Sequence, residues 1–262
     1  MSARPWCLIL GVSGGLGGAS ARALARRGYN VFGVHLDTAE RLGAVEALAE
    51  ELRSIGAQVE LANINAANEA AIKEAISEIA TATESRGVRV LLHSLAFGAL
   101  GPLIRTAPGE EVITSRQMQM TLSVMAHSLV SWVQALWDAR LLPRGAHVLA
   151  FTSIGSTSVV PAYGAVSAAK SALEAHIRQL AFELAPHGIS VNAIRAGVTE
   201  TPAFLRIPGS AELKERAIRY NPHGRLTTPE DVGEAVAHLV AGESSWMTGN
   251  VIGVDGGEKL TL

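Results

Sequence analysis

Tyr163 and Lys170 stand seven residues apart in the stretch that runs from Pro161 to Lys170. On a helix, seven residues turn by about 700°, within roughly 20° of two full turns, so both side chains lie on one face about 10 Å apart. A phenol hydroxyl and an ammonium so placed can donate a proton or stabilise a developing negative charge. Many helices carry a tyrosine and a lysine on one face by coincidence, so the surrounding elements must decide between the two interpretations.

The composition is typical of a soluble globular enzyme. The chain has 262 residues, of which 48% are hydrophobic and 18% charged, enough to bury the core of one α/β domain or two small ones. A net charge of −2 provides no basic field for nucleic acid or an anionic membrane, so we expect small-molecule partners or acidic carriers. The single cysteine, Cys7, excludes an intramolecular disulfide framework and fits a reducing compartment. With no signal pattern and no apolar stretch of the ~18 residues that span a membrane, we expect a cytoplasmic protein.

Short apolar segments alternate with longer amphipathic segments along the chain. This alternation predicts an α/β fold with a doubly wound sheet of about seven parallel strands and helices on both faces. Proline and glycine do not gather into a linker, so we expect one domain over residues 1–262, with a substrate-binding loop at about 196–221 after the sixth strand. The expected strands are Cys7–Leu10, Val31–Leu36, Gln58–Ala62, Val88–His93, His147–Thr152, Ser190–Ile194 and Val251–Val254, and the expected helices are Ala19–Arg27, Thr38–Ile55, Asn68–Thr83, Ser115–Leu141, Tyr163–Ala185 and Pro229–Val240.

Three glycines, Gly11, Gly15 and Gly17, lie between the first expected strand and the first expected helix. A dinucleotide pyrophosphate needs this order, because glycines let backbone N–H groups approach the phosphates and the helix N-terminus supplies partial positive charge. A tight turn that binds no ligand would contain the same glycines. The interpretation as a dinucleotide site therefore depends on the motifs that follow.

The spacing Gly-x-x-x-Gly-x-Gly, together with later motifs in the same order and at similar distances, resembles the short-chain dehydrogenase/reductase family across essentially the whole chain. The resemblance implies a single NAD(P)-binding Rossmann domain. In that family an acidic residue at the end of the second strand selects NAD, and here its position falls on His35. Asp37 could reach the ribose hydroxyls instead, whereas His35 and Arg41 could meet the phosphate of NADP. Both NADH and NADPH therefore stay open as the cofactor.

The resemblance also implies which residues hold the cofactor. Asn63 and Ile64 stand at the adenine, Val198 and Thr199 hold the nicotinamide carboxamide through backbone groups, and Thr201 holds a phosphate. The full implied site consists of Gly11, Ser13, Gly15, Leu16, Gly17, His35, Asp37, Asn63, Ile64, Ser94, Leu95, Ala96, Lys170, Ala196, Gly197, Val198, Thr199 and Thr201.

Ser153, Tyr163 and Lys170 are the implied catalytic residues. Relative to Lys170, Ser153 occupies the serine position of a ketone-reducing family member, but the tyrosine of that motif would fall on Val166. A catalytic hydroxyl must therefore come from Tyr163. Three further departures accompany this one: Ser94–Ala96 follows His93 in place of an Asn-rich turn, Met125 replaces an asparagine, and Ala196-Gly197 replaces Pro-Gly. All four resemble one branch of the family, the enoyl-acyl carrier protein reductases, which use Tyr-x6-Lys.

A geometric reason favours the displaced tyrosine in such an enzyme. In an enoyl thioester, hydride adds to Cβ while negative charge develops on the thioester oxygen three bonds away, so the donor must stand farther from the hydride than in ketone reduction. Tyr163 would stabilise that oxygen by hydrogen bonding. Lys170 would bind the nicotinamide ribose hydroxyls and lower the pKa of the tyrosine. Ser153 either orients the substrate or merely ends a strand.

The expected reaction is the NAD(P)H-dependent reduction of the trans-2 double bond of an enoyl thioester carried on acyl carrier protein, as in fatty acid synthesis. A carbonyl or 3-ketoacyl oxidoreductase of the same family and a non-catalytic dinucleotide-binding sensor are the alternatives. The resemblance implies a homotetramer paired through 115–141 and 163–185, with apolar Trp132 and Trp137 on the first of these helices. The sequence has no Cys/His cluster that would indicate a metal site. The residues expected to wall the acyl channel are Phe97, Met125, Phe204 and Leu205, and those available to meet an acidic carrier are Arg105, Arg195, Arg206 and Lys214.

Overall fold

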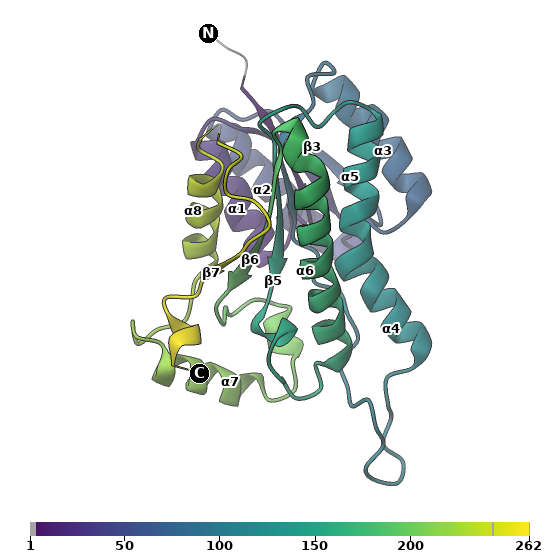
Figure 1. The fold of residues 1–262 in the computed structure, drawn as a ribbon, viewed down its shortest axis with the longest axis vertical. Helices are drawn as coiled ribbons and strands as arrows, with labels where there is room; N and C mark the ends of the chain where they lie inside the picture. Colours follow the sequence, from purple (N-terminus) through teal and green to yellow (C-terminus); the bar gives the residue numbers. More distant parts are fainter. Residues whose placement is uncertain (1–3, 243, 262) are drawn as a thin grey trace.

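Seven parallel strands form one sheet at the centre of the molecule (Figure 1). The structure is a computed structural model that describes residues 4–242 and 244–261. The strand order is β3-β2-β1-β4-β5-β6-β7, so the direction of winding reverses between β1 and β4. In such a sheet, ligands bind beyond the carboxyl ends of the strands near that reversal. The strands are β1 (Trp6–Leu10), β2 (Asn30–His35), β3 (Val59–Asn63), β4 (Val88–His93), β5 (His147–Thr152), β6 (Ser190–Ala196) and β7 (Val251–Val254).

The central strands are buried along their whole length because both faces of the sheet are covered. Every residue of β1, β2 and β5 is buried. A parallel strand enclosed on both faces is a continuous apolar run rather than an alternating one. The prediction of a doubly wound parallel α/β sheet is confirmed.

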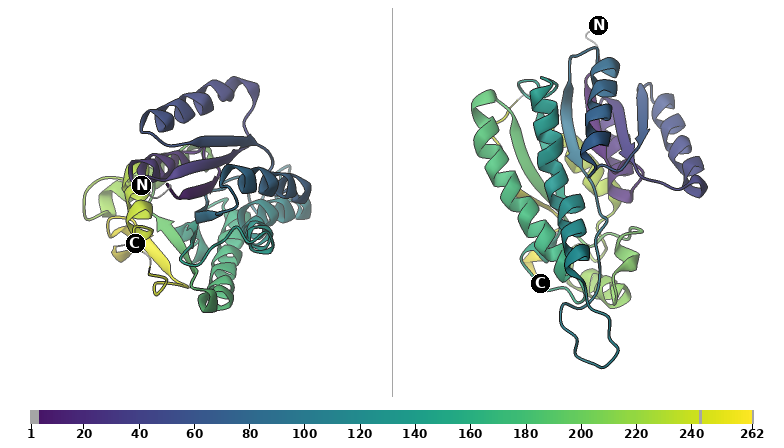
Figure 2. Two further views of the ribbon diagram at one scale, coloured as in Figure 1. Left: turned by 90° about the horizontal axis from the view of Figure 1, so that it is seen from above. Right: turned by 90° about the vertical axis from the view of Figure 1, so that its right-hand side faces the viewer.

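Two helical layers cover the sheet (Figure 2). One core cluster joins one face of the sheet to α3, α5 and α6, and the other joins the opposite face to α1, α2 and α8. None of the helices that the structure describes is long and apolar enough to cross a membrane. The α-helices are α1 (Gly15–Arg26), α2 (Ala39–Ser54), α3 (Glu69–Ala82), α4 (Ser115–Leu122), α5 (Ser128–Asp138), α6 (Gly164–Leu184), α7 (Ser210–Tyr220) and α8 (Pro229–Leu239).

Two of the expected helices have different bounds in the structure, and the segment expected as a loop with short helices contains one helix of 11 residues. The first begins at Gly15, within the glycine turn, and not at Ala19. The long helix expected over 115–141 is interrupted by a π-helical turn, η1 (Ser123–His127), and ends at Asp138. The segment 196–221 contains the 3-10 turn η4 (Phe204–Arg206) and the additional helix α7, which lies below the carboxyl edge of the sheet in Figure 1.

The two tryptophans expected on an apolar outer face lie in different environments. Trp132 is fully buried in the core, and its indole Nε1 donates to the carbonyl of Ala66 at 2.9 Å. Trp137 is 39% exposed and packs against the ring of His187. Only Trp137 is therefore available on the surface of α5.

Candidate active site

The glycine turn is a close-packed cradle that excludes side chains. Gly11 has a φ of +87°, and a Cβ there would stand 2.6 Å from the carbonyl oxygen of Ser94. A Cβ on Gly17 would stand only 2.2 Å from the carbonyl oxygen of Gly11. The next helix begins after Gly14 without a side-chain cap, so the N–H groups of its first turn have no side-chain acceptor. This arrangement of bare backbone at a helix N-terminus fits a pyrophosphate.

The loops that follow three separate strands meet at this cradle. A Cβ on Gly15 would stand 2.9 Å from Cγ2 of Thr201, which follows β6, and a Cβ on Gly17 would stand 3.2 Å from Oγ of Ser94, which follows β4. The peptide N–H of Ser94 also donates to the carbonyl of Leu10 at the end of β1. The structure therefore brings the predicted cofactor residues of these loops together.

The end of β2 holds a small ionic cluster around Asp37. One carboxylate oxygen of Asp37 lies 3.2 Å from Nδ1 of His35, and the other lies 3.3 Å from Nε of Arg41. The side chain of Asn63 exchanges two hydrogen bonds with the backbone of Asp37. The amide of Ile64 donates to the carbonyl of His35. Asp37, expected at the ribose hydroxyls, thus contacts both residues expected at the phosphate of NADP. The side chains of Asp37 and His35 are almost fully buried, and the Arg41 guanidinium is half exposed.

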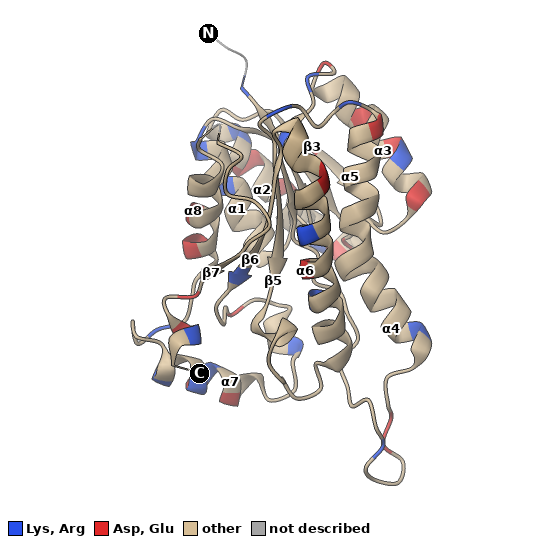
Figure 3. Ribbon diagram, viewed as in Figure 1, with Lys and Arg blue, Asp and Glu red and all other residues tan. Residues whose placement is uncertain are grey.

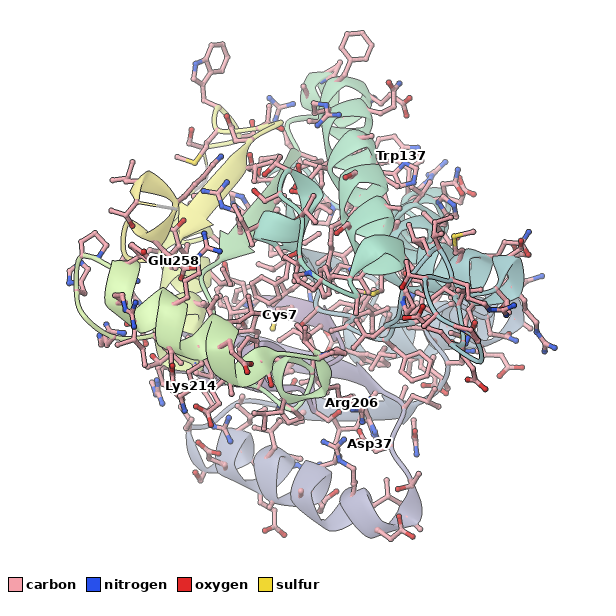
Figure 4. The ribbon with its side chains drawn as sticks, turned by 90° about the horizontal axis from the view of Figure 1, so that it is seen from below. Cys7, Asp37, Trp137, Arg206, Lys214 and Glu258 are labelled. Carbon is pink, nitrogen blue, oxygen red and sulfur yellow. The ribbon has the colours of Figure 1, made fainter. Side chains whose placement is uncertain are left out.

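The N–H of Val198 is paired within the protein alone. It donates to Oε2 of Glu258 at 3.0 Å, and the contact of Val198 with a nicotinamide carboxamide stays a prediction. Glu258, which is labelled in Figure 4, is 3% exposed and belongs to the short 3-10 helix η5 (Glu258–Leu260). Burial raises the pKa of this carboxyl. Thr199, whose hydroxyl donates to the carbonyl of Gly197, keeps its backbone groups available.

Tyr163 lies at the N-cap of α6, and the helix itself begins at Gly164. The preceding residue, Ala162, has a φ of +58°, a left-handed conformation that costs a non-glycine residue roughly 1 kcal/mol. The tyrosine ring packs on η2 (Ile154–Ser156), because a Cβ on Gly155 would stand 2.8 Å from both Cδ1 and Cε1 of the ring. The turn after β5 thus fixes the position of the phenol.

The hydroxyl of Tyr163 faces Ser153. Burial raises the pKa of Tyr163, and the interaction with Ser153 only partly opposes this rise. Burial is the dominant influence in the protein alone, and the expectation that Lys170 lowers the pKa of the tyrosine stays a prediction. The pair of hydroxyls falls outside ordinary hydrogen-bond geometry, and Oγ of Ser153 is buried without a partner among the described residues. A buried hydroxyl of this kind can donate a hydrogen bond to a bound ligand or accept one from it.

Lys170 is buried in α6 beneath the carboxyl end of β5. Its Nζ donates to the carbonyl of Phe151 at 2.7 Å, and its side chain shares this region with Glu174, one helical turn further along. Burial lowers the pKa of Lys170 to about 8, although the charge of Glu174 opposes the change. The carboxylate of Glu174 accepts a hydrogen bond from Thr152 at 2.6 Å. Lys170 is therefore a buried cation whose charge is lost just above neutral pH.

The position that would hold the tyrosine of a ketone reductase is filled by packing. Val166 is 3% exposed and clusters with Met125 and Ala169. A Cβ on Gly98 would stand 2.8 Å from Cγ2 of Val166 and 2.9 Å from the sulfur of Met125. A phenol at this position would have no room. Among the expected channel residues, Met125 and Phe204 are buried, whereas Phe97 and Leu205 are 58% and 60% exposed.

Sequence reasoning missed three buried polar residues around this site: Glu174, Glu258 and His93. Glu174 stands four residues after Lys170, and this i,i+4 spacing was a signal that could have revealed it. His93 ends β4 and is fully buried. For Glu258 the sequence offers no comparable signal, because its partner Val198 lies 60 residues away.

Comparisons with known proteins show the family of the chain. A family model described as Enoyl-(Acyl carrier protein) reductase matches residues 11–259. The chain is 33% identical over 177 residues to the enoyl-acyl-carrier-protein reductase (NADH) of Aquifex aeolicus, an alignment that spans 65% of this chain and 62% of that protein. It is 25% identical over 252 residues to the 3-oxoacyl-acyl-carrier-protein reductase of Thermotoga maritima, with 96% of each chain covered. The crystal structure of the Aquifex aeolicus enoyl reductase has a TM-score of 0.82 at 26% identity, covering 98% of this chain and 96% of that one.

These relatives are named for two different activities but belong to one family. The alignment with the enoyl reductase sequence spans less than two thirds of that protein, and the alignment with the 3-oxoacyl reductase spans nearly all of it. The matched family model covers almost the whole chain, including the glycine turn and the segment from Ser153 to Lys170. The chain therefore belongs to the short-chain dehydrogenase/reductase family, as an oxidoreductase that matches the model described as enoyl-(acyl carrier protein) reductase.

Proposed function

We propose that this protein reduces the trans-2 double bond of an enoyl thioester with NADH or NADPH. The observation that carries the proposal is where the valine and the tyrosine lie at the start of α6. Val166 is sealed into an apolar cluster, and Tyr163, at the N-cap, faces Ser153. The phenol is therefore displaced from the ketone-reducing position toward the start of the helix. This displacement suits a substrate whose charged oxygen lies three bonds from the carbon that is reduced.

Tyr163 and Lys170 would have separate roles in this reaction. The cofactor, when bound, supplies the hydride. Tyr163 stays protonated at neutral pH because burial raises its pKa, so it acts as a hydrogen-bond donor to the thioester oxygen as negative charge develops there. Lys170 donates one N–H to the carbonyl of Phe151, and its remaining N–H groups are the candidates for the ribose hydroxyls.

Ser153 supports a second candidate, the reduction of a 3-ketoacyl thioester. Its buried hydroxyl stands where a ketone-reducing family member carries serine, next to the displaced tyrosine. The relative from Thermotoga maritima that aligns over almost the full chain is named for that activity. The two candidates use the same cofactor and the same three residues, so turnover must separate them.

Parallel assays with crotonyl and longer enoyl thioesters, acetoacetyl thioester and simple ketones test the proposal. Each assay follows the oxidation of NADH and of NADPH at the same enzyme concentration. We expect kcat/KM to be highest for an enoyl thioester. Faster reduction of acetoacetyl thioester would replace the proposal with the 3-ketoacyl activity, and cofactor binding without turnover of any substrate would indicate a sensor.

Acyl carrier protein is the proposed carrier of the substrate. Two of the four candidate basic residues are already paired, Arg195 with Asp255 and Lys214 with Glu200. Arg105 and Arg206 are exposed and form no ion pair within the residues that the structure describes. Figure 3 shows that charges of both signs also lie along α7. We therefore assign contact with an acidic carrier to Arg105 and Arg206.

A further inference from the structure

His93 is a buried histidine on the same side of the sheet as Lys170. It ends β4 with no exposed surface and pairs in register with Ala150 of β5. Because side chains alternate along a strand, His93 faces the same layer as Leu91. Leu91 and Ala150 belong to the core cluster that contains residues of α5 and α6. The imidazole therefore lies between the sheet and the helix that carries Lys170.

The hydrogen bonds of His93 determine which ring nitrogen carries the proton. Its Nε2 lies 2.8 Å from Oγ of Ser128, and this hydroxyl donates its one proton to the carbonyl of Val124 at 2.7 Å. The hydroxyl must then accept from Nε2–H of the imidazole. Nδ1 keeps a lone pair that is buried and finds no partner among the described residues. A buried acceptor without a partner is unusual and marks a place for a bound polar group.

Lys170 provides matching donors on the facing helix. An ammonium has three N–H groups, and only one of them is donated to the carbonyl of Phe151. Burial, and after it the charge of Lys170, lower the pKa of His93 to about 3. The imidazole is thus neutral throughout the working range of pH and can act only as an acceptor at Nδ1. The other charged group near the ammonium is Glu174, which already accepts from Thr152.

We propose that a single water molecule binds between Nδ1 of His93 and Nζ of Lys170, and that His93 is thereby a positioning residue for the ammonium. A water that accepts from the ammonium and donates to the imidazole satisfies both buried groups. It also aims the remaining N–H of Lys170 toward the cofactor side of the sheet. The inference rests on the proposed role of Lys170 at the ribose, but not on the identity of the substrate.

Two amide variants separate the two nitrogens of the imidazole. The side-chain amide of His93→Gln reaches the place of Nε2 and can still donate to Ser128, but it leaves nothing at Nδ1. The amide of His93→Asn places an oxygen near Nδ1 and loses the contact with Ser128. Ser128→Ala is the matched control, because it removes the partner of Nε2 and leaves Nδ1 intact. Thermal unfolding of each variant reports any purely structural loss.

The measurement is the dissociation constant of NADH and of NADPH between pH 6 and 10, in the absence of substrate. In the wild-type protein, His93→Asn and Ser128→Ala, affinity should fall as the pH rises through about 8, where Lys170 loses its proton. A hydrogen bond to the ammonium stabilises its charged form, so His93→Gln should lower the midpoint by about one pH unit. A His93→Gln midpoint equal to that of the wild type, or an equal shift in His93→Asn, would overturn the proposal.

A high-resolution crystal structure of the wild-type protein provides the second test, which does not depend on any variant folding. We expect a water within hydrogen-bond distance of both Nδ1 of His93 and Nζ of Lys170, and its absence would also overturn the proposal. Because neither measurement uses a substrate, both results stand even if the enzyme proves to reduce ketones. A wrong assignment of the substrate would appear only in the turnover assays.

Discussion

Burial shifts the pKa values of Tyr163 and Lys170 in opposite directions. Removal from water raises the pKa of the phenol and lowers that of the ammonium to about 8. Each shift favours the neutral form of its group. At neutral pH the tyrosine is fully protonated and the lysine still largely charged, which is the combination needed to donate a hydrogen bond to an enolate and to hold ribose hydroxyls.

Tyr163→Phe removes the proposed donor and little else. We expect kcat to fall by roughly 10²-fold or more, because a hydrogen bond to the developing oxyanion is lost, while the dissociation constant of the cofactor changes little. Tyr220→Phe, on the exposed side of α7, is the matched control and should leave both quantities unchanged. Steady-state kinetics with a crotonyl thioester measure the effect. An unaltered kcat would remove Tyr163 from the mechanism.

Asp37→Ala should change the preference between the two cofactors. The carboxylate of Asp37 binds His35 and Arg41 and would repel a 2′-phosphate, so its loss frees two basic groups for that phosphate. We expect the ratio of kcat/KM for NADPH over NADH to rise about tenfold, which corresponds to about 1.4 kcal/mol. Glu40→Ala removes a neighbouring exposed carboxylate and should leave the ratio as it is. An unchanged ratio in the Asp37 variant would show that this cluster does not determine the preference between NADH and NADPH.

At the scale of elements, the turns that follow the strands hold the side chains of the site in place, as the turn after β5 does for Tyr163. Gly155→Ala places a methyl group where the ring of Tyr163 now packs, so the phenol must move. We expect kcat to fall by roughly tenfold to 10²-fold, since a displacement of about 1 Å can cost that much, with cofactor affinity unchanged. Gly43→Ala, at an open position in α2, is the control and should be neutral. Equal activity in the two variants would show that the turn after β5 does not hold the tyrosine.

The strands were predictable from sequence because a parallel strand buried on both faces is a largely apolar run, as in β1 and the centre of β5. The start of α1 at Gly15 was not predictable, since glycine is a poor helix former. The glycines of its first turn are required by tertiary contacts, as where Gly17 closely approaches Gly11. The π-helical turn at Ser123–His127 leaves the helical pattern of its sequence almost unchanged.

The candidate site was predictable only in part, for a related reason. The spacing of Tyr163 and Lys170 is local, so the sequence displays it directly. The contact of Glu258 with the amide of Val198 and the burial of His93 depend on tertiary packing between distant segments. Local periodicity has no means of indicating such contacts.

At the scale of the whole molecule, the proposed homotetramer would bury the outer faces of α5 and α6. Phe182 of α6 is 78% exposed, and Trp137 of α5 is 39% exposed. We expect light scattering to give the mass of a tetramer, and Phe182→Glu to give a smaller species because a buried charge without a partner is costly. Ile104→Glu, equally exposed but on the loop before α4, should keep the wild-type mass. A monomeric wild-type protein would contradict the assembly.

Cys7 has a consequence for experiments on the whole molecule. It is the only cysteine of the chain, it lies inside the sheet in β1 with no exposed surface, and burial raises the pKa of its thiol (Figure 4). Cys7 packs in the core between the sheet and the layer of α1, α2 and α8, so a thiol reagent can reach it only when that core opens. The rate of labelling therefore measures how often this core opens, and a bound dinucleotide should slow it in proportion to the stability that it adds.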